Sequence, residues 1–250
     1  MSLKGKIALV TGSGRNIGRT IALTLASRGA DLFIHDLPAS EGAEAVADEV
    51  RALGRRAWVL GADLRHVKQI RTMFDEIKEQ TGRLDILVNN AAMGAARGAM
   101  RISPSNWDLT LETSARSVVF CSQHAARLMT SGWGRIVNLS SLGSRRYIPD
   151  YIAIGASKSV VENVTRAFAV ELAPKGILVN CVCGGMIDTS TLKHLGPSIQ
   201  AQKADYEARC PMKRLGRPDD LAKVVAFLCS DDAGWIVGQT IVADGGFSLL

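Results

Sequence analysis

The chain has 250 residues, of which 47% are hydrophobic and 22% are charged, and its 30 lysines and arginines exceed its 24 acidic residues to give a net charge of +6. This balance is ordinary for a folded globular protein and excludes a disordered chain. The length suits a single α/β domain over residues 1–250 that needs no disulfide or metal to support its core. The basic residues are spread along the chain, so no nucleic-acid partner is expected.

The distribution of cysteines and apolar residues predicts a cytoplasmic protein. The five cysteines are too few and too irregularly spaced for a secreted disulfide framework, which indicates reduced thiols. No apolar run approaches the ~20 residues of a membrane-spanning helix. Only four apolar residues, Ile7–Val10, follow the N-terminal segment, whereas a signal peptide has a hydrophobic region of ~7–15 residues.

Short apolar runs alternate with longer segments of helical periodicity along the whole chain. The predicted strands are 7–10, 32–35, 57–60, 86–89, 135–139, 177–183 and 240–242. The predicted helices are 17–29, 40–53, 66–80, 104–131, 154–173 and 218–229. This alternation predicts an α/β fold, a doubly wound seven-stranded parallel sheet with helices on both faces. Continuously apolar strands fit a sheet that is covered on both faces.

The segment 184–212 interrupts this rhythm. It is longer and more polar than the other connections, and it contains Pro197 and Pro211. A long segment after a late strand is typical of a mobile lid over a substrate. We therefore expect residues 184–212 to act as a substrate lid within the domain.

A glycine-rich turn follows the first predicted strand directly and precedes the first helix. Its sequence is Thr11-Gly12-Ser13-Gly14-Arg15-Asn16-Ile17-Gly18. Glycines at such a turn let backbone N–H groups approach a pyrophosphate at the N-terminus of a helix. A tight turn without a ligand is the alternative. The strand before and the helix after favour a dinucleotide site.

The cofactor type depends on two residues of opposite charge. Asp36 ends the second predicted strand, eighteen residues after Gly18, where a carboxylate accepts hydrogen bonds from the adenosine ribose hydroxyls and repels a 2′-phosphate. Asp36 therefore favours NAD(H). Arg15 lies in the glycine loop and is able to pair with a 2′-phosphate, so NADP(H) stays open as the alternative.

Two further strand ends carry polar residues at the edge where an open sheet binds its ligand. Asp63 follows the third strand and is placed to accept a hydrogen bond from the adenine amino group. Asn90 and Ala91 close the fourth strand. No metal site is expected, because the four histidines form no metal-ligand spacing; they are His35, His66, His124 and His194.

Taken together, these residues resemble the short-chain dehydrogenase/reductase family over essentially the whole chain. The resemblance rests on TGSGRNIG at 11–18, NNAA at 89–92, GRIVNLSS at 134–141, ASK at 156–158, ELAPKGILVN at 171–180, IDT at 187–189 and GQTIVADGG at 238–246. It implies a Rossmann fold, a nicotinamide cofactor and a homotetramer. The cofactor-binding residues that it implies are Gly12, Ser13, Arg15, Asn16, Ile17, Asp36, Asp63, Leu64, Asn90, Ala91, Lys158, Gly185, Ile187 and Thr189.

The chain departs from the family pattern at several positions. Asn16 stands where the family has glycine, and Ala92 where it has the glycine of NNAG. Gly184 replaces a proline before Gly185. The helix asparagine of the usual catalytic tetrad falls at Ser114.

The most consequential departure concerns the catalytic acid. The family's Tyr-x-x-x-Lys would place tyrosine at position 154, which is isoleucine, although Lys158 and Ser141 are present. Tyr151 precedes Lys158 by seven residues, two helical turns, so the two would share a helix face. A Tyr-x6-Lys pair resembles the enoyl-acyl-carrier-protein reductases. The run 140–158, with Gly184-Gly185, is similar to their subgroup III.

This resemblance implies reduction of the C=C bond of a trans-2-enoyl thioester. Tyr151 would stabilise the enolate oxygen, Ser141 would add a donor, and Lys158 would hold the nicotinamide ribose and lower the pKa of the phenol. Tyr147 and Met186 are candidates for substrate contact. The substrate is expected on a carrier protein or as a small molecule.

Two other functions stay open at this point. A displaced tyrosine also suits a carbonyl reductase or alcohol dehydrogenase, because an alkoxide needs the same proton donor. Ile154 and Ser114 also fit a catalytically inactive NAD-binding sensor or subunit. Arg145 and Arg146 are placed to steer an acidic carrier protein, although such a pair is more often a solvated loop.

Overall fold

The computed structural model describes residues 2–193 and 197–250. Seven parallel strands form one sheet in the order β3-β2-β1-β4-β5-β6-β7. The strands are β1 Ile7–Val10, β2 Asp31–Asp36, β3 Ala57–Gly61, β4 Ile86–Asn89, β5 Gly134–Ser141, β6 Ile177–Gly184 and β7 Thr240–Ala243. The predicted seven-stranded sheet is confirmed, and every predicted strand overlaps an observed one.

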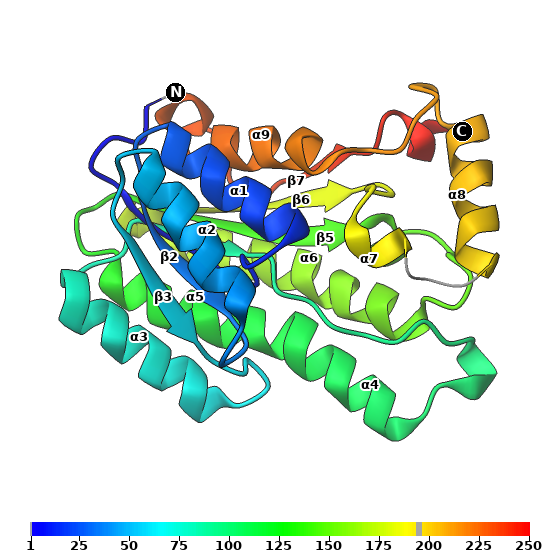
Figure 1. The fold of residues 1–250 in the computed structure, drawn as a ribbon, viewed down its shortest axis with the longest axis horizontal. Helices are drawn as coiled ribbons and strands as arrows, with labels where there is room; N and C mark the ends of the chain where they lie inside the picture. Colours follow the sequence, from blue (N-terminus) through cyan, green and yellow to red (C-terminus); the bar gives the residue numbers. More distant parts are fainter. Residues whose placement is uncertain (1, 194–196) are drawn as a thin grey trace.

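Helices cover both faces of the sheet, which gives three layers (Figure 1). They are α1 Asn16–Ser27, α2 Glu41–Ala52, α3 Val67–Thr81, α4 Pro104–Leu111, α5 Ser117–Leu128, α6 Ile152–Leu172, α7 Ser190–Lys193, α8 Pro197–Arg209 and α9 Pro218–Leu228. One layer contains α1, α2 and α9, and the other contains α3, α5 and α6. Single 3-10 turns lie at Ala99–Arg101, Leu142–Ser144, Ala173–Lys175, Asp231–Ala233 and Phe247–Leu249.

The strand side chains alternate between two hydrophobic cores. Ala8 and Val10 of β1 pack in the core beneath α1, α2 and α9, whereas Ile7 and Leu9 pack in the core beneath α3 and α5. Because both faces are covered, every position of β1 is buried, which explains its continuous apolar run.

The predicted helix 104–131 is interrupted. A π-helical turn over Glu112–Arg116 separates α4 from α5. The hydroxyl of Ser114 accepts a hydrogen bond from the Met93 N–H and donates one to the Met93 carbonyl, both at 3.1 Å. The partner lies in the loop after β4, so no short-range pattern in the sequence reveals the interruption.

The segment 184–212 is largely helical where it is described. It contains α7 and α8, and α8 lies beside the C-terminal turn in Figure 1. The Tyr206 hydroxyl donates to the Asp244 carbonyl at 2.8 Å, and its ring stacks on Phe247. The middle of the expected lid, with His194, lies outside the described residues. The C-terminal end of α8 is thus anchored to the segment after β7.

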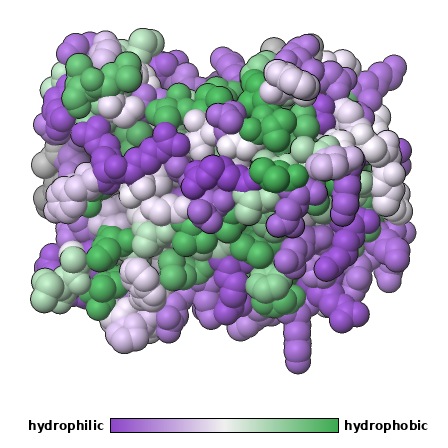
Figure 2. All heavy atoms as spheres, turned by 180° about the vertical axis from the view of Figure 1, so that it is seen from behind, coloured by the Kyte–Doolittle hydropathy of each residue, from purple (hydrophilic) through white to green (hydrophobic). Residues whose placement is uncertain are grey.

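The surface mixes polar and apolar residues. Figure 2 shows several apolar patches between hydrophilic residues on the face opposite to that of Figure 1. Trp235 is 97% exposed, and Val170 is 75% exposed. Among residues 2–193 and 197–250, no helix has the length and apolar character needed to cross a membrane.

Candidate active site

The candidate site lies at the carboxyl ends of the strands. The arrowheads of β5 and β6 point toward α7 and α8 (Figure 1). The strand order reverses between β1 and β4, which are neighbours although β2 and β3 lie between them in sequence. In open α/β sheets such a reversal opens a crevice that binds ligands. The glycine loop follows β1 at this crevice.

The glycine loop is held by residues that follow β4. The Thr11 hydroxyl accepts hydrogen bonds from the N–H groups of Asn90 and Ala91, both at 3.0 Å. The Asn90 amide donates to the carbonyls of Thr11 and Gly12, at 2.9 and 3.0 Å. A Cβ on Gly18 would lie 2.1 Å from the Gly12 carbonyl oxygen, so only glycine lets α1 approach the loop. Asn90 supports the loop that would receive a pyrophosphate.

Asp36 ends β2 beside the glycine loop. Its carboxylate accepts hydrogen bonds from the Leu37 N–H at 2.8 Å and the Ser40 hydroxyl at 3.0 Å. A Cβ on Gly14 would lie 2.3 Å from the carboxylate, so the absence of a side chain there makes room for it. The glycine loop and this carboxylate together fit a nicotinamide dinucleotide.

Asp63 is more constrained than the sequence suggests. Its carboxylate accepts hydrogen bonds from Nε of Arg65 at 3.0 and 2.9 Å, and the two side chains form an ion pair. The Arg65 guanidinium lowers the pKa of Asp63, although partial burial opposes it. The neighbouring Leu64 is 4% exposed. Asp63 is therefore an ionised acceptor whose direction is fixed by Arg65.

His35 is a supporting residue that the sequence analysis did not identify. Its Nδ1 accepts a hydrogen bond from the Gly12 N–H at 3.1 Å, and its Nε2 lies 3.1 Å from the Ala62 carbonyl oxygen. Burial lowers its pKa from 6.5 to about 4, so the ring is neutral at pH 7 and Nε2 carries the proton. A lone histidine at a strand end gives no sequence signal for this role.

Asn16 connects the glycine loop to α7. It has a φ of 49°, a left-handed conformation that asparagine tolerates better than most residues, which explains how it replaces glycine here. Its side-chain oxygen accepts hydrogen bonds from the Ser190 N–H at 3.2 Å and the Ser190 hydroxyl at 2.8 Å. The sequence analysis did not identify Ser190 as a site residue.

The structure brings the three expected catalytic side chains to one end of β5 and α6. The Ser141 hydroxyl donates to the Tyr151 phenol oxygen at 3.3 Å. The buried Lys158 ammonium donates to the Leu139 carbonyl at 2.8 Å. Tyr151 lies immediately before α6, which starts at Ile152, two residues earlier than expected. Tyr151 is thus the N-cap residue of α6, outside the expected helix 154–173 as well as the observed one, and Lys158 lies within the helix.

Burial shifts the pKa values of both ionisable groups. It lowers the pKa of Lys158 from 10.5 to about 8 and raises that of the Tyr151 phenol, although the hydrogen bond from Ser141 opposes the latter shift. The effect of Lys158 on the phenol stays a prediction; in this structure desolvation has the largest influence and raises the pKa of the Tyr151 phenol. The phenol is protonated at neutral pH and suited to donate.

Ile154 fills the position of the family's usual tyrosine. A Cβ on Gly94 would lie 2.8 Å from Cγ1 of Ile154 and 3.0 Å from Oγ1 of Thr110, so the isoleucine packs beside the loop after β4. No proton donor stands at this helix position. Ser114 is engaged with Met93, as described above, and supports the same loop.

A buried acid fixes the turn that carries Ser141. The Glu162 carboxylate, from α6, accepts hydrogen bonds from the hydroxyls of Ser140 at 2.9 Å and Ser144 at 2.6 Å, and from Nε of Arg145 at 2.8 Å. Burial alone would raise the pKa of Glu162, but these donors lower it. Arg145 is thus paired with Glu162 within the chain.

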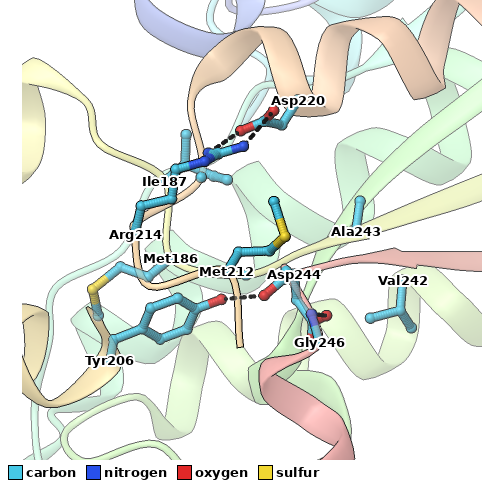
Figure 3. A pocket seen from close by; sticks show the side chains of 13 residues that line it. Met186, Ile187, Tyr206, Met212, Arg214, Asp220, Val242, Ala243, Asp244 and Gly246 are labelled. Atoms are coloured by element: carbon cyan, nitrogen blue, oxygen red, sulfur yellow. Dashed lines mark hydrogen bonds and ion pairs between the residues drawn. The ribbon is translucent and has the colours of Figure 1, made fainter. Parts of the chain in front are cut away.

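The two candidate substrate residues differ in placement. The Tyr147 ring is 85% exposed. Met186 and Ile187 border a cavity of about 300 Å³ beside Tyr206, Met212 and the Arg214–Asp220 ion pair (Figure 3). Gly185 also lines this cavity, which contains neither Tyr151 nor Lys158. Thr189, half-buried, lies next to Ser190 at the start of α7.

The described part of the chain shows no cluster of three or more histidine, cysteine or acidic side chains that could hold a metal ion.

Comparisons with known proteins agree with this arrangement. A family described as Enoyl-(Acyl carrier protein) reductase matches residues 12–248. The 1-cyclohexenylcarbonyl-CoA reductase of Streptomyces collinus is 38% identical over 250 residues, which cover 98% of this chain and 88% of that protein.

Solved structures share the whole fold. A short-chain dehydrogenase from Burkholderia cenocepacia in complex with NADP is 37% identical, with a TM-score of 0.92 over 99% of this chain and 100% of the other. A 7α-hydroxysteroid dehydrogenase, complexed with NADH and 7-oxo glycochenodeoxycholic acid, is 32% identical, with a TM-score of 0.92 over 98% and 95% of the two chains. The chain belongs to the short-chain dehydrogenase/reductase family of NAD(P)-dependent oxidoreductases.

Proposed function

We propose that this protein reduces the C=C bond of trans-2-enoyl thioesters with a nicotinamide cofactor. The observation that carries the proposal is the position of Tyr151. Its phenol lies 3.3 Å from the Ser141 hydroxyl at the start of the helix that carries Lys158, while Ile154 fills the usual tyrosine position. The proton donor thus stands three residues earlier in the chain than in the family's usual pattern.

This displacement suits the chemistry of an enoyl thioester. When bound, the nicotinamide would supply a hydride to the β-carbon of the substrate. Negative charge would then develop on the thioester oxygen, which lies one conjugated double bond further from the reacting carbon than the oxygen of a ketone does. The Tyr151 O–H donates a hydrogen bond to that oxygen, and the Ser141 hydroxyl orients the phenol. Because this charge exists only during reaction, the two donors stabilise the transition state more than the bound substrate and so lower the barrier. A proton from Tyr151 or from water would complete the product at the α-carbon.

Lys158 holds the cofactor side of the site. Its ammonium is buried and donates to the Leu139 carbonyl, and we propose that it also hydrogen-bonds a ribose hydroxyl of the nicotinamide when the cofactor is bound. The Streptomyces collinus relative supports the substrate class, because its name specifies a thioester whose carbonyl is conjugated to a ring double bond.

Carbonyl reduction is the second candidate, and the Ser141–Tyr151 contact favours it. A hydroxyl paired with a phenol is also what an alkoxide needs for protonation. The hydroxysteroid dehydrogenase with its bound 7-oxo compound is a neighbour of this type.

We further propose NAD(H) as the preferred cofactor, on the position of the Asp36 carboxylate beside Gly14. The substrate is proposed to be a coenzyme A or acyl-carrier-protein thioester. A homotetramer is proposed as the assembly, and the exposed Trp235 and Val170 side chains are consistent with further burial between subunits.

The test is oxidation of NADH and NADPH followed at 340 nm with crotonyl-CoA and acetoacetyl-CoA. We expect consumption with crotonyl-CoA, faster with NADH. Tyr151→Phe is expected to lower kcat by about 10²-fold or more, because a positioned acid is lost. Tyr147→Phe removes the same atom from an exposed ring and is expected to have a much smaller effect. Consumption of acetoacetyl-CoA alone would instead establish the carbonyl reductase.

A further inference from the structure

The residue before Tyr151 has an unusual backbone conformation. Asp150 has a φ of 58°, in the left-handed region that few residues other than glycine adopt, although aspartate and asparagine are tolerated there. It follows Pro149 in a turn. Proline followed by a residue with positive φ is the pattern of a type II turn. This turn sets the direction in which the chain reaches Tyr151.

The turn is tied to the loop that follows β4. The Asp150 carbonyl accepts a hydrogen bond from the Arg97 N–H at 2.7 Å, and Arg97 forms a parallel bridge with Tyr151. The Asp150 carboxylate lies 3.4 Å from the Arg101 guanidinium. Arg101 is 75% exposed and Asp150 37% exposed at the side chain, so this ion pair contributes little by itself. The backbone contacts are the stronger connection.

Tyr151 depends on this turn because it precedes the helix. A tyrosine at position 154 would lie within the hydrogen-bonded ladder of α6, whereas Tyr151 has a φ of −118° and a ψ of 14° outside it. Its ring also packs on Gly143. A Cβ there would lie 2.5 Å from Cδ1 of the ring. The phenol is thus directed by the turn on one side and by a glycine on the other.

We propose that Asp150 is a positioning residue, whose left-handed conformation directs the Tyr151 phenol toward Ser141 and links it to the loop after β4. The catalytic consequence rests on the proposed function, whereas the position of the ring does not. A tyrosine that precedes the helix therefore needs a turn to direct its side chain, whereas a tyrosine at position 154 would be directed by the helix itself.

Substitutions at position 150 separate backbone conformation from charge. Asp150→Asn and Asp150→Gly keep access to the left-handed region and are expected to keep kcat with crotonyl-CoA near that of the wild type. Asp150→Val, with a branched side chain disfavoured there, is expected to lower kcat about tenfold or more. The Kd for NADH is expected to stay unchanged, and it also reports that each variant is folded. Arg101→Gln removes the ion pair and serves as the control.

A second measurement reads the ring without any turnover. The chain has three tyrosines, so 3-fluorotyrosine labelling gives three ¹⁹F resonances that single Tyr→Phe variants assign. Burial raises the pKa of the Tyr151 phenol. In the wild type, Asp150→Asn and Asp150→Gly, we expect the pKa read from its resonance to lie above the pKa of free 3-fluorotyrosine. In Asp150→Val, we expect this pKa to lie closer to that of free 3-fluorotyrosine.

The outcomes are distinct. Wild-type kcat and titration in Asp150→Val would overturn the proposal. Equal losses in Asp150→Asn and Asp150→Val would also overturn it, because the carboxylate and not the conformation would then be responsible. Full crotonyl-CoA reduction by Tyr151→Phe would refute the proposed function alone, and the ¹⁹F titration would still decide the role of Asp150.

Discussion

Asp36 is predicted to set the charge at the adenosine end of the cofactor site. Its carboxylate is held by Leu37 and Ser40 and lies against Gly14, where no side chain intervenes. A ribose 2′-phosphate brought to this place would meet a fixed negative charge. Ribose hydroxyls would instead find a charged acceptor, and hydrogen bonds to charged groups contribute about 1.5–3 kcal/mol.

Asp36→Ala is therefore expected to move cofactor selectivity toward NADPH by about tenfold or more, measured as the ratio of kcat/KM for NADH to that for NADPH. Asp36→Asn keeps a polar side chain of the same size without the charge, and it isolates the electrostatic part. An unchanged ratio in Asp36→Ala would show that another residue, with Arg15 as the first candidate, selects the cofactor.

At the scale of elements, α7 and the glycine loop meet through one side chain. Asn16 begins α1, and its amide oxygen accepts both the N–H and the hydroxyl of Ser190 at the start of α7. The loop supports the proposed pyrophosphate site, and α7 follows the predicted cofactor residue Thr189. The Asn16–Ser190 contact is thus expected to hold α7 against the glycine loop when the cofactor is bound.

Asn16→Gly keeps the left-handed conformation and removes the amide, and Ser190→Ala removes the hydroxyl alone. Each is expected to speed NADH dissociation about three- to tenfold, as the loss of a hydrogen bond worth about 1 kcal/mol implies. Displacement of NADH followed by stopped-flow fluorescence measures this rate. The double variant is expected to resemble Asn16→Gly, because the two residues share the contact. Additive effects would contradict a shared contact.

At the scale of the whole molecule, His35 joins the ends of three strands. It lies on β2 and connects the Gly12 N–H after β1 to the Ala62 carbonyl after β3. Its pKa is about 4 in the folded protein and 6.5 when unperturbed. Above pH 6.5 the ring is neutral in both states. Between pH 6.5 and 4 only the unfolded chain binds the proton, so the free energy of unfolding falls as the pH falls.

The free energy of unfolding is expected to fall by about 3 kcal/mol between pH 6.5 and 4. Thermal unfolding at pH values from 7.5 to 4 measures it. His35→Asn lacks the ring that joins the strand ends, so its Tm at pH 7.5 is expected to lie below that of the wild type. Because asparagine does not titrate in this range, the difference in Tm is expected to narrow toward pH 4. A constant gap would mean that His35 is not the titrating group.

Sequence alone determined the layered fold and named the candidate residues of the site. Strand and helix periods are local properties, and a sheet covered on both faces requires the apolar runs that they show. The glycine loop, Asp36, Ser141, Tyr151 and Lys158 were all recognisable in this way or by resemblance. Even the Pro149–Asp150 pair before Tyr151 is a turn signal that the sequence carries.

Only the tertiary structure decided how these residues are supported. The π turn at Ser114 is held by hydrogen bonds to Met93. The neutral His35 ring is held by Gly12 and Ala62. Asn16 makes its contact with α7 through Ser190. Each partner is distant in sequence, and a hydrogen bond between distant residues leaves no periodicity to detect. The pKa of Tyr151 likewise follows from burial, which packing sets, and not from its spacing to Lys158.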